Sequence, residues 1–150
     1  MKDPCDDIRD WLYTTLNGHL GYGGSNVPVY SFPPKNLAKP YVIIGEHAAE
    51  MRTGAKDTYM WDIYTNIEIY TSFSYNNASY VMVNNISTQI LRLLINRAGG
   101  TYGTEEGNDD LTNFKAVRII PGSMATEREI AETEILITKT ISINILAEEH

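Results

Sequence analysis

With 150 residues, of which 43% are hydrophobic and 21% charged, the chain suits one folded domain around one core and not a disordered polymer. Its formal net charge of −7 disfavours tight nucleic-acid binding, because an acidic surface repels phosphate. We expect a soluble protein made in a cytoplasm, since the sequence has neither a run of about 18 apolar residues nor an apolar N-terminal stretch.

The first expected element is a short helix over residues 4–17. Asp3 can accept a backbone N–H bond as the N-cap, and Pro4 suits the first helical position. Apolar residues at helical spacing form one face: Ile8, Trp11, Leu12 and Leu16. Residues 21–26 then predict a flexible loop, because they are rich in glycine and lack the lysine of a phosphate-binding loop.

Strand patterns follow this loop. A short extended piece covers residues 27–31, and a strand covers residues 41–45, directly after Pro40. The strongest pattern lies in residues 61–71, where two sets of side chains alternate. Trp61, Ile63, Thr65, Ile67 and Ile69 make up one set, and Asp62, Tyr64, Asn66, Glu68 and Tyr70 the other. A period of two predicts a strand with the first set covered and the second set wetter.

The second half of the chain predicts one more helix and two more strands. The helix covers residues 77–98, with Val83, Ile86, Ile90, Leu93, Leu94 and Arg97 spaced by three or four. Strands cover residues 114–120, closed by Pro121-Gly122, and residues 133–146, where isoleucines share a face that Lys139 interrupts. The predicted fold class is α+β, an antiparallel or mixed sheet of four to five strands with two α-helices packed on one face.

Three polar segments separate these elements and predict long loops: 46–58, 101–113 and 123–132. Loops of this length are longer than turn geometry requires and are often functional. They are either surface decoration or arms that reach neighbouring subunits. The acidic residues in 101–113 lack the spacing of an EF-hand calcium loop, which favours a solvated loop.

The cysteine and histidine side chains, which could carry chemistry, do not form the pattern of a catalytic or metal site. Cys5 lies among aspartates, whose charge raises the pKa of the thiol. His19, His47 and His150 have no metal-ligand spacing. His47 next to Glu46 could be a base with its partner, but neighbours on a strand point to opposite faces. We therefore expect no enzyme activity and no cofactor.

A short phrase in the first half resembles the tail terminator, or tail-completion, proteins of tailed bacteriophages. The phrase is Val27-Pro28-Val29-Tyr30, a proline-containing gap, and then Pro40-Tyr41-Val42-Ile43-Ile44-Gly45-Glu46. The order of elements is also similar, from the N-terminal helix through the strand at 61–71 and the long helix to the two closing strands. The resemblance covers most of the chain.

This resemblance implies a virion protein at the head–tail junction that forms a ring, usually a hexamer. Its expected partners are copies of itself, the tail tube protein and the head–tail connector, with DNA only passing through the central channel and no membrane contact. An acidic channel wall would let DNA slide. The longer segments 101–113 and 123–132 depart from shorter family members, which leaves the ring size and the position in the virion open.

Interface side chains are expected among tyrosines and among Met, Arg and charged residues of the polar segments. The candidates are Met51, Arg52, Lys56, Tyr59, Tyr64, Tyr70, Glu105, Glu106 and Arg128. We expect deletion of residues 48–57 to leave a folded monomer that no longer forms rings. Two rival interpretations remain: another joining component, such as a stopper or collar ring, and a small-molecule-binding or hydrolytic α+β domain that uses His47 and Glu46.

Overall fold

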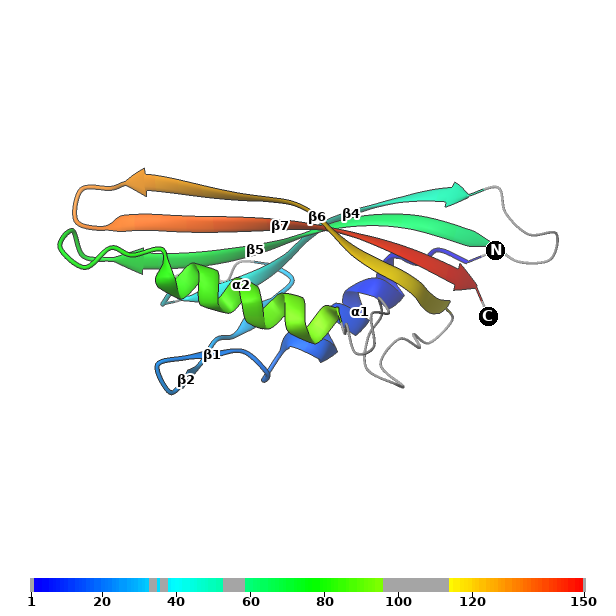
Figure 1. The fold of residues 1–150 in the computed structure, drawn as a ribbon, viewed down its shortest axis with the longest axis horizontal. Helices are drawn as coiled ribbons and strands as arrows, with labels where there is room; N and C mark the ends of the chain where they lie inside the picture. The colour runs from blue at the N-terminus through cyan, green and yellow to red at the C-terminus, as the bar shows by residue number, and fades with distance from the viewer. Residues whose placement is uncertain (1, 33–34, 36–37, 53–58, 96–113, 150) are drawn as a thin grey trace.

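The computed structural model describes residues 2–32, 35, 38–52, 59–95 and 114–149. Within these residues the chain forms two α-helices, a five-stranded mixed sheet and a small two-stranded sheet (Figure 1). The predicted α+β class is therefore confirmed. In the same part of the chain, no helix is long and apolar enough to cross a membrane.

The main sheet has the strand order β3-β4-β5-β7-β6. Its strands are β3 (Val29–Tyr30), β4 (Tyr41–Arg52), β5 (Met60–Phe73), β6 (Phe114–Ile130) and β7 (Ile135–Glu149). The short strand β3 runs parallel to β4, and every other neighbouring pair is antiparallel. β7 follows β6 in the chain but lies between β5 and β6, so the described sheet has β3 and β4 at one edge and β6 at the other.

Both helices lie beneath one face of this sheet (Figure 1). The helix α1 (Cys5–Leu16) begins one residue later than expected, and the Asp3 carboxylate accepts the Cys5 N–H at 2.9 Å. The predicted apolar face of α1 is buried: Ile8, Trp11, Leu12 and Leu16. The helix α2 (Val81–Leu94) begins four residues after the predicted start, because the Ser79 hydroxyl accepts the Val81 N–H at 3.1 Å and the chain before it forms turns.

The core lies between the helices and the sheet. Alternate residues of β5 and β7 face it, as the alternation predicted, and Ile63, Ile67, Ile141 and Ile145 are fully buried there. Val83, Ile86, Ile90 and Leu94 of α2 cover them from below. Arg97, the last residue of the predicted helix pattern, lies outside the described residues.

The predicted loop at 46–58 is wrong for residues 46–52, which continue β4. The register of β4 against β5 shifts between Ile44 and His47, so Gly45 and Glu46 form a β-bulge, and the ladder then resumes as far as Arg52. Residues 53–58 lie outside the described residues. Deleting 48–57 would therefore remove five strand residues, and the expected folded monomer is not the outcome that this structure supports.

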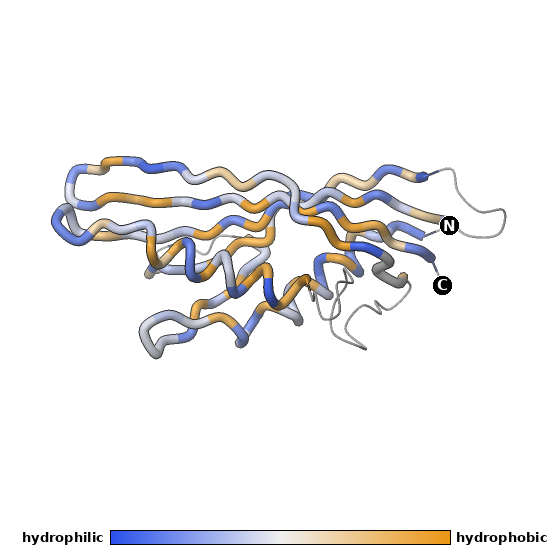
Figure 2. The backbone as a smooth tube through the Cα atoms, in the orientation of Figure 1, coloured by the Kyte–Doolittle hydropathy of each residue, from blue (hydrophilic) through white to orange (hydrophobic). Residues whose placement is uncertain are grey.

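The predicted loop at 123–132 is also mostly strand. β6 does not close at Pro121-Gly122 but passes through a second register shift between Pro121 and Met124 and continues to Ile130. A short turn at 131–134 connects it to β7. Figure 2 shows that the outer end of β6 carries mainly hydrophilic residues. The segment 101–113 lies outside the described residues.

The glycine-rich segment after α1 is a hairpin, not a plain loop. β1 (Gly21–Tyr22) pairs with β2 (Ser25–Asn26), and the two turn residues Gly23 and Gly24 have φ angles of +60° and +83°. A two-residue hairpin turn of this type needs positive φ at both positions, which glycine adopts without strain. Gln89 of α2 fastens the hairpin, because its side chain accepts the Gly21 N–H and donates to the Gly21 carbonyl.

The β4 bulge and the β6 register shift between Pro121 and Met124 lie at the same level of the sheet, and β6 has a further shift between Ala116 and Arg118 nearer the chain ends. A Cβ at Gly45 would be 2.9 Å from the Asn66 carbonyl oxygen, and a Cβ at Gly122 would be 3.0 Å from the Ser142 carbonyl oxygen. Asn66 and Ser142 face each other across β5 and β7. Bulges increase local twist, and the strands cross at this level in Figure 1.

This level divides the sheet into two parts. We call the part that carries both chain ends the base half, and the part that carries the β6–β7 turn the tip half. The base half contains residues 47–52, 60–65, 114–121 and 143–149, and the tip half contains residues 41–44, 67–73, 124–130 and 135–141.

Candidate assembly surfaces

The sheet face opposite the helices, which we call the open face, carries a row of aromatic rings. Tyr30, Tyr41 and Tyr70 come from β3, β4 and β5, and Tyr41 stacks on Tyr70 with ring centroids 5.2 Å apart. The Tyr70 hydroxyl donates to the Glu68 carboxylate at 3.1 Å. Burial, followed by the charge of Glu68, raises the pKa of Tyr70 to about 12. Tyr70 is therefore held within a neutral aromatic row and is only partly available to a partner.

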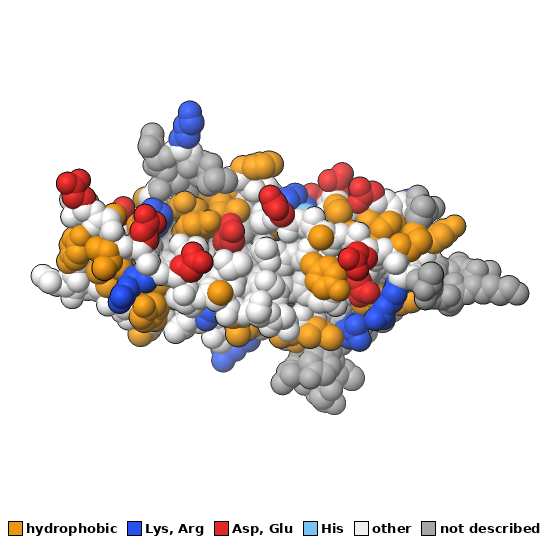
Figure 3. Space-filling model, turned by 90° about the horizontal axis from the view of Figure 1, so that it is seen from above, with side chains coloured by type: hydrophobic (Ala, Val, Ile, Leu, Met, Phe, Trp, Pro, Cys, Tyr) orange, Lys and Arg blue, Asp and Glu red, His pale blue; other side chains and the backbone are white. Residues whose placement is uncertain are grey.

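The centre of the open face is polar but mostly uncharged. The Ser142 hydroxyl donates to the Asn66 side-chain oxygen at 2.9 Å, and Tyr64 stands beside them with 48% of its surface exposed. Figure 3 shows this face from above, with acidic side chains dispersed among uncharged ones. Such a face can contact water or a second protein surface, and its acidic groups do not favour a bound nucleic acid.

The histidine that could serve a hydrolytic site lies on the other face. His47 follows the β4 bulge and pairs with Thr65, which is buried on the helix side. Burial, and then the nearby Arg9 guanidinium, lowers the pKa of His47 to about 4, and both ring nitrogens are buried without a hydrogen-bond partner. Glu46 is exposed in the bulge, and no hydrogen bond joins it to His47.

Arg9 explains why this bulge is stable. Its guanidinium donates to the carbonyls of Ile44 and Gly45 at 3.2 and 3.0 Å, so α1 satisfies backbone groups that the bulge leaves without a ladder partner. Arg9 therefore fastens α1 to β4. Its charge opposes protonation of the nearby His47, whose two ring nitrogens are buried.

Cys5 lines a hollow between the start of α1 and the base half of the sheet. The hollow has a volume of about 390 Å³, and its walls are Lys2, Asp3, Cys5, Ala49 and Trp61. Burial, and then the hydrogen bond and charge of Asp3, raises the pKa of the Cys5 thiol, so the thiol is a poor nucleophile at neutral pH. The described residues contain no group of three or more metal-ligating side chains.

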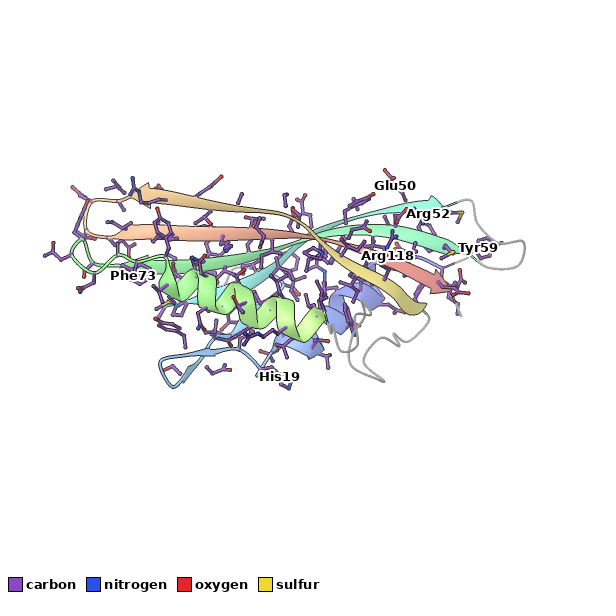
Figure 4. All side chains as sticks on the ribbon, in the orientation of Figure 1. His19, Glu50, Arg52, Tyr59, Phe73 and Arg118 are labelled. Atoms are coloured by element: carbon purple, nitrogen blue, oxygen red, sulfur yellow. The ribbon has the colours of Figure 1, made fainter. Side chains whose placement is uncertain are left out.

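The predicted interface residues fall in three separate places. Met51, Arg52 and Tyr59 lie at the free end of the base half, and all three are exposed. Figure 4 labels Arg52 and Tyr59 at this end of the molecule. The Arg52 Nε is 3.1 Å from the Asp62 carboxylate, so this arginine is already paired within its own sheet.

The other predicted residues do not join this group. Tyr64 and Tyr70 lie on the open face, and Arg128 lies in the exposed outer part of β6. Lys56, Glu105 and Glu106 lie outside the described residues. That the remaining candidates form a subunit interface stays a prediction.

The sequence interpretation missed an apolar group in the tip half. Met124 and Ile130 of β6 are 50% and 62% exposed, Tyr75 and Tyr80 are exposed in the connection from β5 to α2, and Val81 is exposed at the start of α2. The two segments meet where the Tyr75 hydroxyl donates to the Ala131 carbonyl. For β6, the signal was present as Met124 and Ile130 in the segment 123–132, which the sequence predicts as a long polar loop.

Both edges of the sheet are open over several residues. β3 pairs only with Val42 and Ile43, so no described strand covers the outer edge of β4 from Ile44 to Arg52. On the opposite side, β6 has a partner only in β7 within the described sheet, and residues 122–130 are exposed. Open edges present unpaired N–H and C=O groups and are ready to accept another strand.

Comparisons with known proteins show which solved structure has a similar fold. No protein-family model matches the chain, and no curated protein matches it. Among solved structures, the chain is similar to a chain from the virion of a native gene transfer agent particle. The two are 14% identical with a TM-score of 0.53, and the match covers 95% of this chain and 90% of that chain. At this identity the similarity shows a shared fold over nearly the whole length of both chains.

Proposed function

We propose that this chain is a structural subunit of a phage-like particle and works by assembling into a ring. The observation that carries this proposal is the fold shared, over nearly the full chain, with a protein chain in a gene transfer agent virion. The open edges of β4 and β6 and the exposed apolar side chains of the tip half add surfaces of the kind that protein partners cover.

Within that particle, the proposed position is the head-proximal end of the tail. There the ring would cap the tail tube, join it to the head connector, and leave a central channel for DNA. Support comes from the phrase around residues 27–46 and the order of elements, which resemble the tail terminator proteins. The net charge of −7 also fits a channel wall along which DNA slides without adhering.

A second candidate is another ring of the same junction, such as a stopper or collar component. The extended β6–β7 arm favours it, because its outer part carries exposed residues on both faces and reaches beyond α2 (Figure 1). An arm of this kind can bridge to an adjoining ring. The two candidates differ in one neighbour, because only the first caps the tail tube protein, whereas both contact the connector.

Native mass spectrometry tests the proposal most directly. The purified chain is measured alone and after mixing with a tail tube protein or a connector protein from a genome that encodes it. We expect a closed oligomer, and a heavier complex with the tail tube protein. A chain that stays monomeric under all three conditions, and that is absent from purified particles by mass spectrometry, would refute the ring proposal.

A further inference from the structure

The base half of the sheet carries a row of open-face residues that runs from one edge to the other. Register pairs Glu50 with Asp62, Asp62 with Leu146, and Leu146 with Arg118. Glu50 lies on the open edge of β4 and Arg118 on the open edge of β6. The row therefore begins with an acid and ends with a base.

The inner and outer members of this row differ in their pairing. Asp62 already binds Arg52 at 3.1 Å. Neither Glu50 nor Arg118 has an ion-pair partner among the described residues, and the Arg118 Nε is buried without a hydrogen-bond acceptor. Figure 4 shows Glu50 and Arg118 in the same half of the sheet. At this level of the described sheet, each edge thus presents a charge without an ion-pair partner, and the two charges are opposite.

Strand direction allows these edges to meet. Each step from β4 to β5, from β5 to β7 and from β7 to β6 reverses the direction, so β6 runs opposite to β4. A second copy in the same orientation would therefore place its β4 antiparallel to the β6 of the first copy. This contact uses two different edges, which is the heterologous type that closes rings.

The register of such a contact follows from the row itself. If the sheet continues at one level, Arg118 lies opposite Glu50 of the neighbouring copy and Ile120 lies opposite Ala48. Two features limit the ladder to a few residues: Pro121 cannot donate a backbone hydrogen bond, and the register of β6 shifts between Ala116 and Arg118. The contact is therefore a short ladder fixed by one ion pair.

We propose that copies of this chain join head to tail by continuing the sheet, with the β6 edge around Arg118 bound to the β4 edge around Glu50 of the next copy. This inference rests on the proposed ring and deepens it, because it names the two surfaces that make the ring. The partner is a second copy of this chain, since only the copy supplies the complementary edge in the matching direction and at the matching level.

Charge reversal separates this contact from other modes of association. Arg118→Glu places two acids at the contact, and Glu50→Arg places two bases there. Like charges that face each other at an interface repel. We therefore expect the fraction of chains in rings, measured by native mass spectrometry, to fall at least about tenfold for each variant alone.

Mixing the two variants gives the decisive measurement. In a head-to-tail ring, the new acid at position 118 of the first variant would meet the new base at position 50 of the second. The unchanged Arg118 of the second variant would meet the unchanged Glu50 of the first. We therefore expect the equimolar mixture to form rings with an even number of copies in strict alternation. The Arg118→Glu, Glu50→Arg double variant should form rings alone. Recovery by mixing also shows that both single variants are folded.

Two controls test whether a loss of rings comes from this contact. Arg92→Glu makes the same charge change on an exposed residue of α2 beneath the sheet and should leave the ring unchanged. In a Cys5→Ser background, Ala48→Cys with Ile120→Cys should oxidise to a covalent ladder of oligomers. Ala48→Cys with Ala125→Cys should not, because Ala125 lies in the tip half.

The outcomes separate this inference from the ring proposal. Suppose that the unmodified chain forms rings. The edge contact is then wrong, and the ring proposal stands, under any of three results. Either single charge-reversal variant still forms rings, the mixture of the two variants forms no rings, or the Ala48→Cys, Ile120→Cys variant gives no covalent oligomers. If the unmodified chain never associates, both proposals fail together.

Discussion

The base half and the tip half of the sheet are built from the same strands but are covered differently. In the base half β6 is fastened to the core, with Phe114 and Ile119 fully buried. In the tip half α2 lies under β5 and β7, and the outer residues of β6 are exposed on both faces. β6 therefore belongs to the core at one end and is an exposed arm at the other.

The largest effect is expected at two isoleucines of β6, one in each half of the sheet. Ile119→Ala removes a 1% exposed side chain and should lower the free energy of unfolding by about 2–5 kcal/mol. Ile130→Ala, on the same side of the same strand but 62% exposed, should change it by less than about 0.5 kcal/mol. Urea denaturation of both variants checks this. Equal losses would mean that the arm is packed as firmly as the core.

The next largest effect is expected at the two glycines on the boundary between the halves. Gly45→Ala brings a Cβ within 2.9 Å of the Asn66 carbonyl, and we expect a loss of about 1–3 kcal/mol of stability. Gly122→Ala meets the Ser142 carbonyl at 3.0 Å, but its loss should be smaller, because β6 can shift there while Arg9 holds the Ile44 and Gly45 carbonyls of β4 in place. Thermal unfolding ranks the two. A larger loss at Gly122 would contradict the greater rigidity of β4 at its bulge.

How much of this division could be predicted from the sequence depends on contrast between faces. Residues 61–71 alternate between isoleucines and polar side chains because helices cover one face and not the other, so the strand and its faces were predicted correctly. Residues 124–130 of β6 have both faces exposed, so no alternation separates Met124, Thr126 and Arg128 from Ala125, Glu127 and Glu129. Without that contrast a strand looks like a polar linker.

The candidate surfaces were predictable only in part for the same reason. Exposed tyrosines and arginines such as Tyr59, Tyr64 and Arg52 could be named from composition, because such residues are enriched at interfaces. The row that joins Glu50 to Arg118 could not, because it requires the register of four strands, including the register shifts of β4 and β6. Neither residue stands out in the sequence.

A pH-dependent effect comes from the base half. The pKa of His47 is about 4 in the folded chain, mainly through burial, against an ordinary value of 6.5. Between these values the unfolded chain binds one more proton, so stability is complete above pH 6.5 and falls as the pH drops towards 4. Because His47 is only half buried, we expect a loss of about 1 kcal/mol.

Urea denaturation at several pH values, for the unmodified chain and for His47→Gln, measures this contribution. The difference between the two proteins should shrink as the pH is lowered, while the shared titration of carboxylates cancels. A constant difference from neutral pH down to the folded-state pKa would show that His47 titrates normally in the folded chain.

The smallest expected effect concerns the aromatic row. Tyr70 has a pKa of about 12, raised first by burial and then by Glu68. Glu68→Gln should lower the pKa of Tyr70, because it removes the negative charge next to the phenol and leaves burial in place. Phenolate absorbance during an alkaline titration measures this shift, with Tyr70→Phe identifying the Tyr70 signal. An unchanged titration curve would remove Glu68 as a cause.

The strand order has a consequence for synthesis of the chain. β7 is made after β6, yet it is inserted between β5 and β6 and gives both of them their ladder. Until the ribosome has released β7, the inner edge of β5 has no strand partner, and the isoleucines of β5 lack the neighbouring side chains of β7. A fragment from translation that stops before Ile135 would therefore expose unpaired strand edges and tend to aggregate. In the complete chain, β7 pairs with both β5 and β6 in one late step.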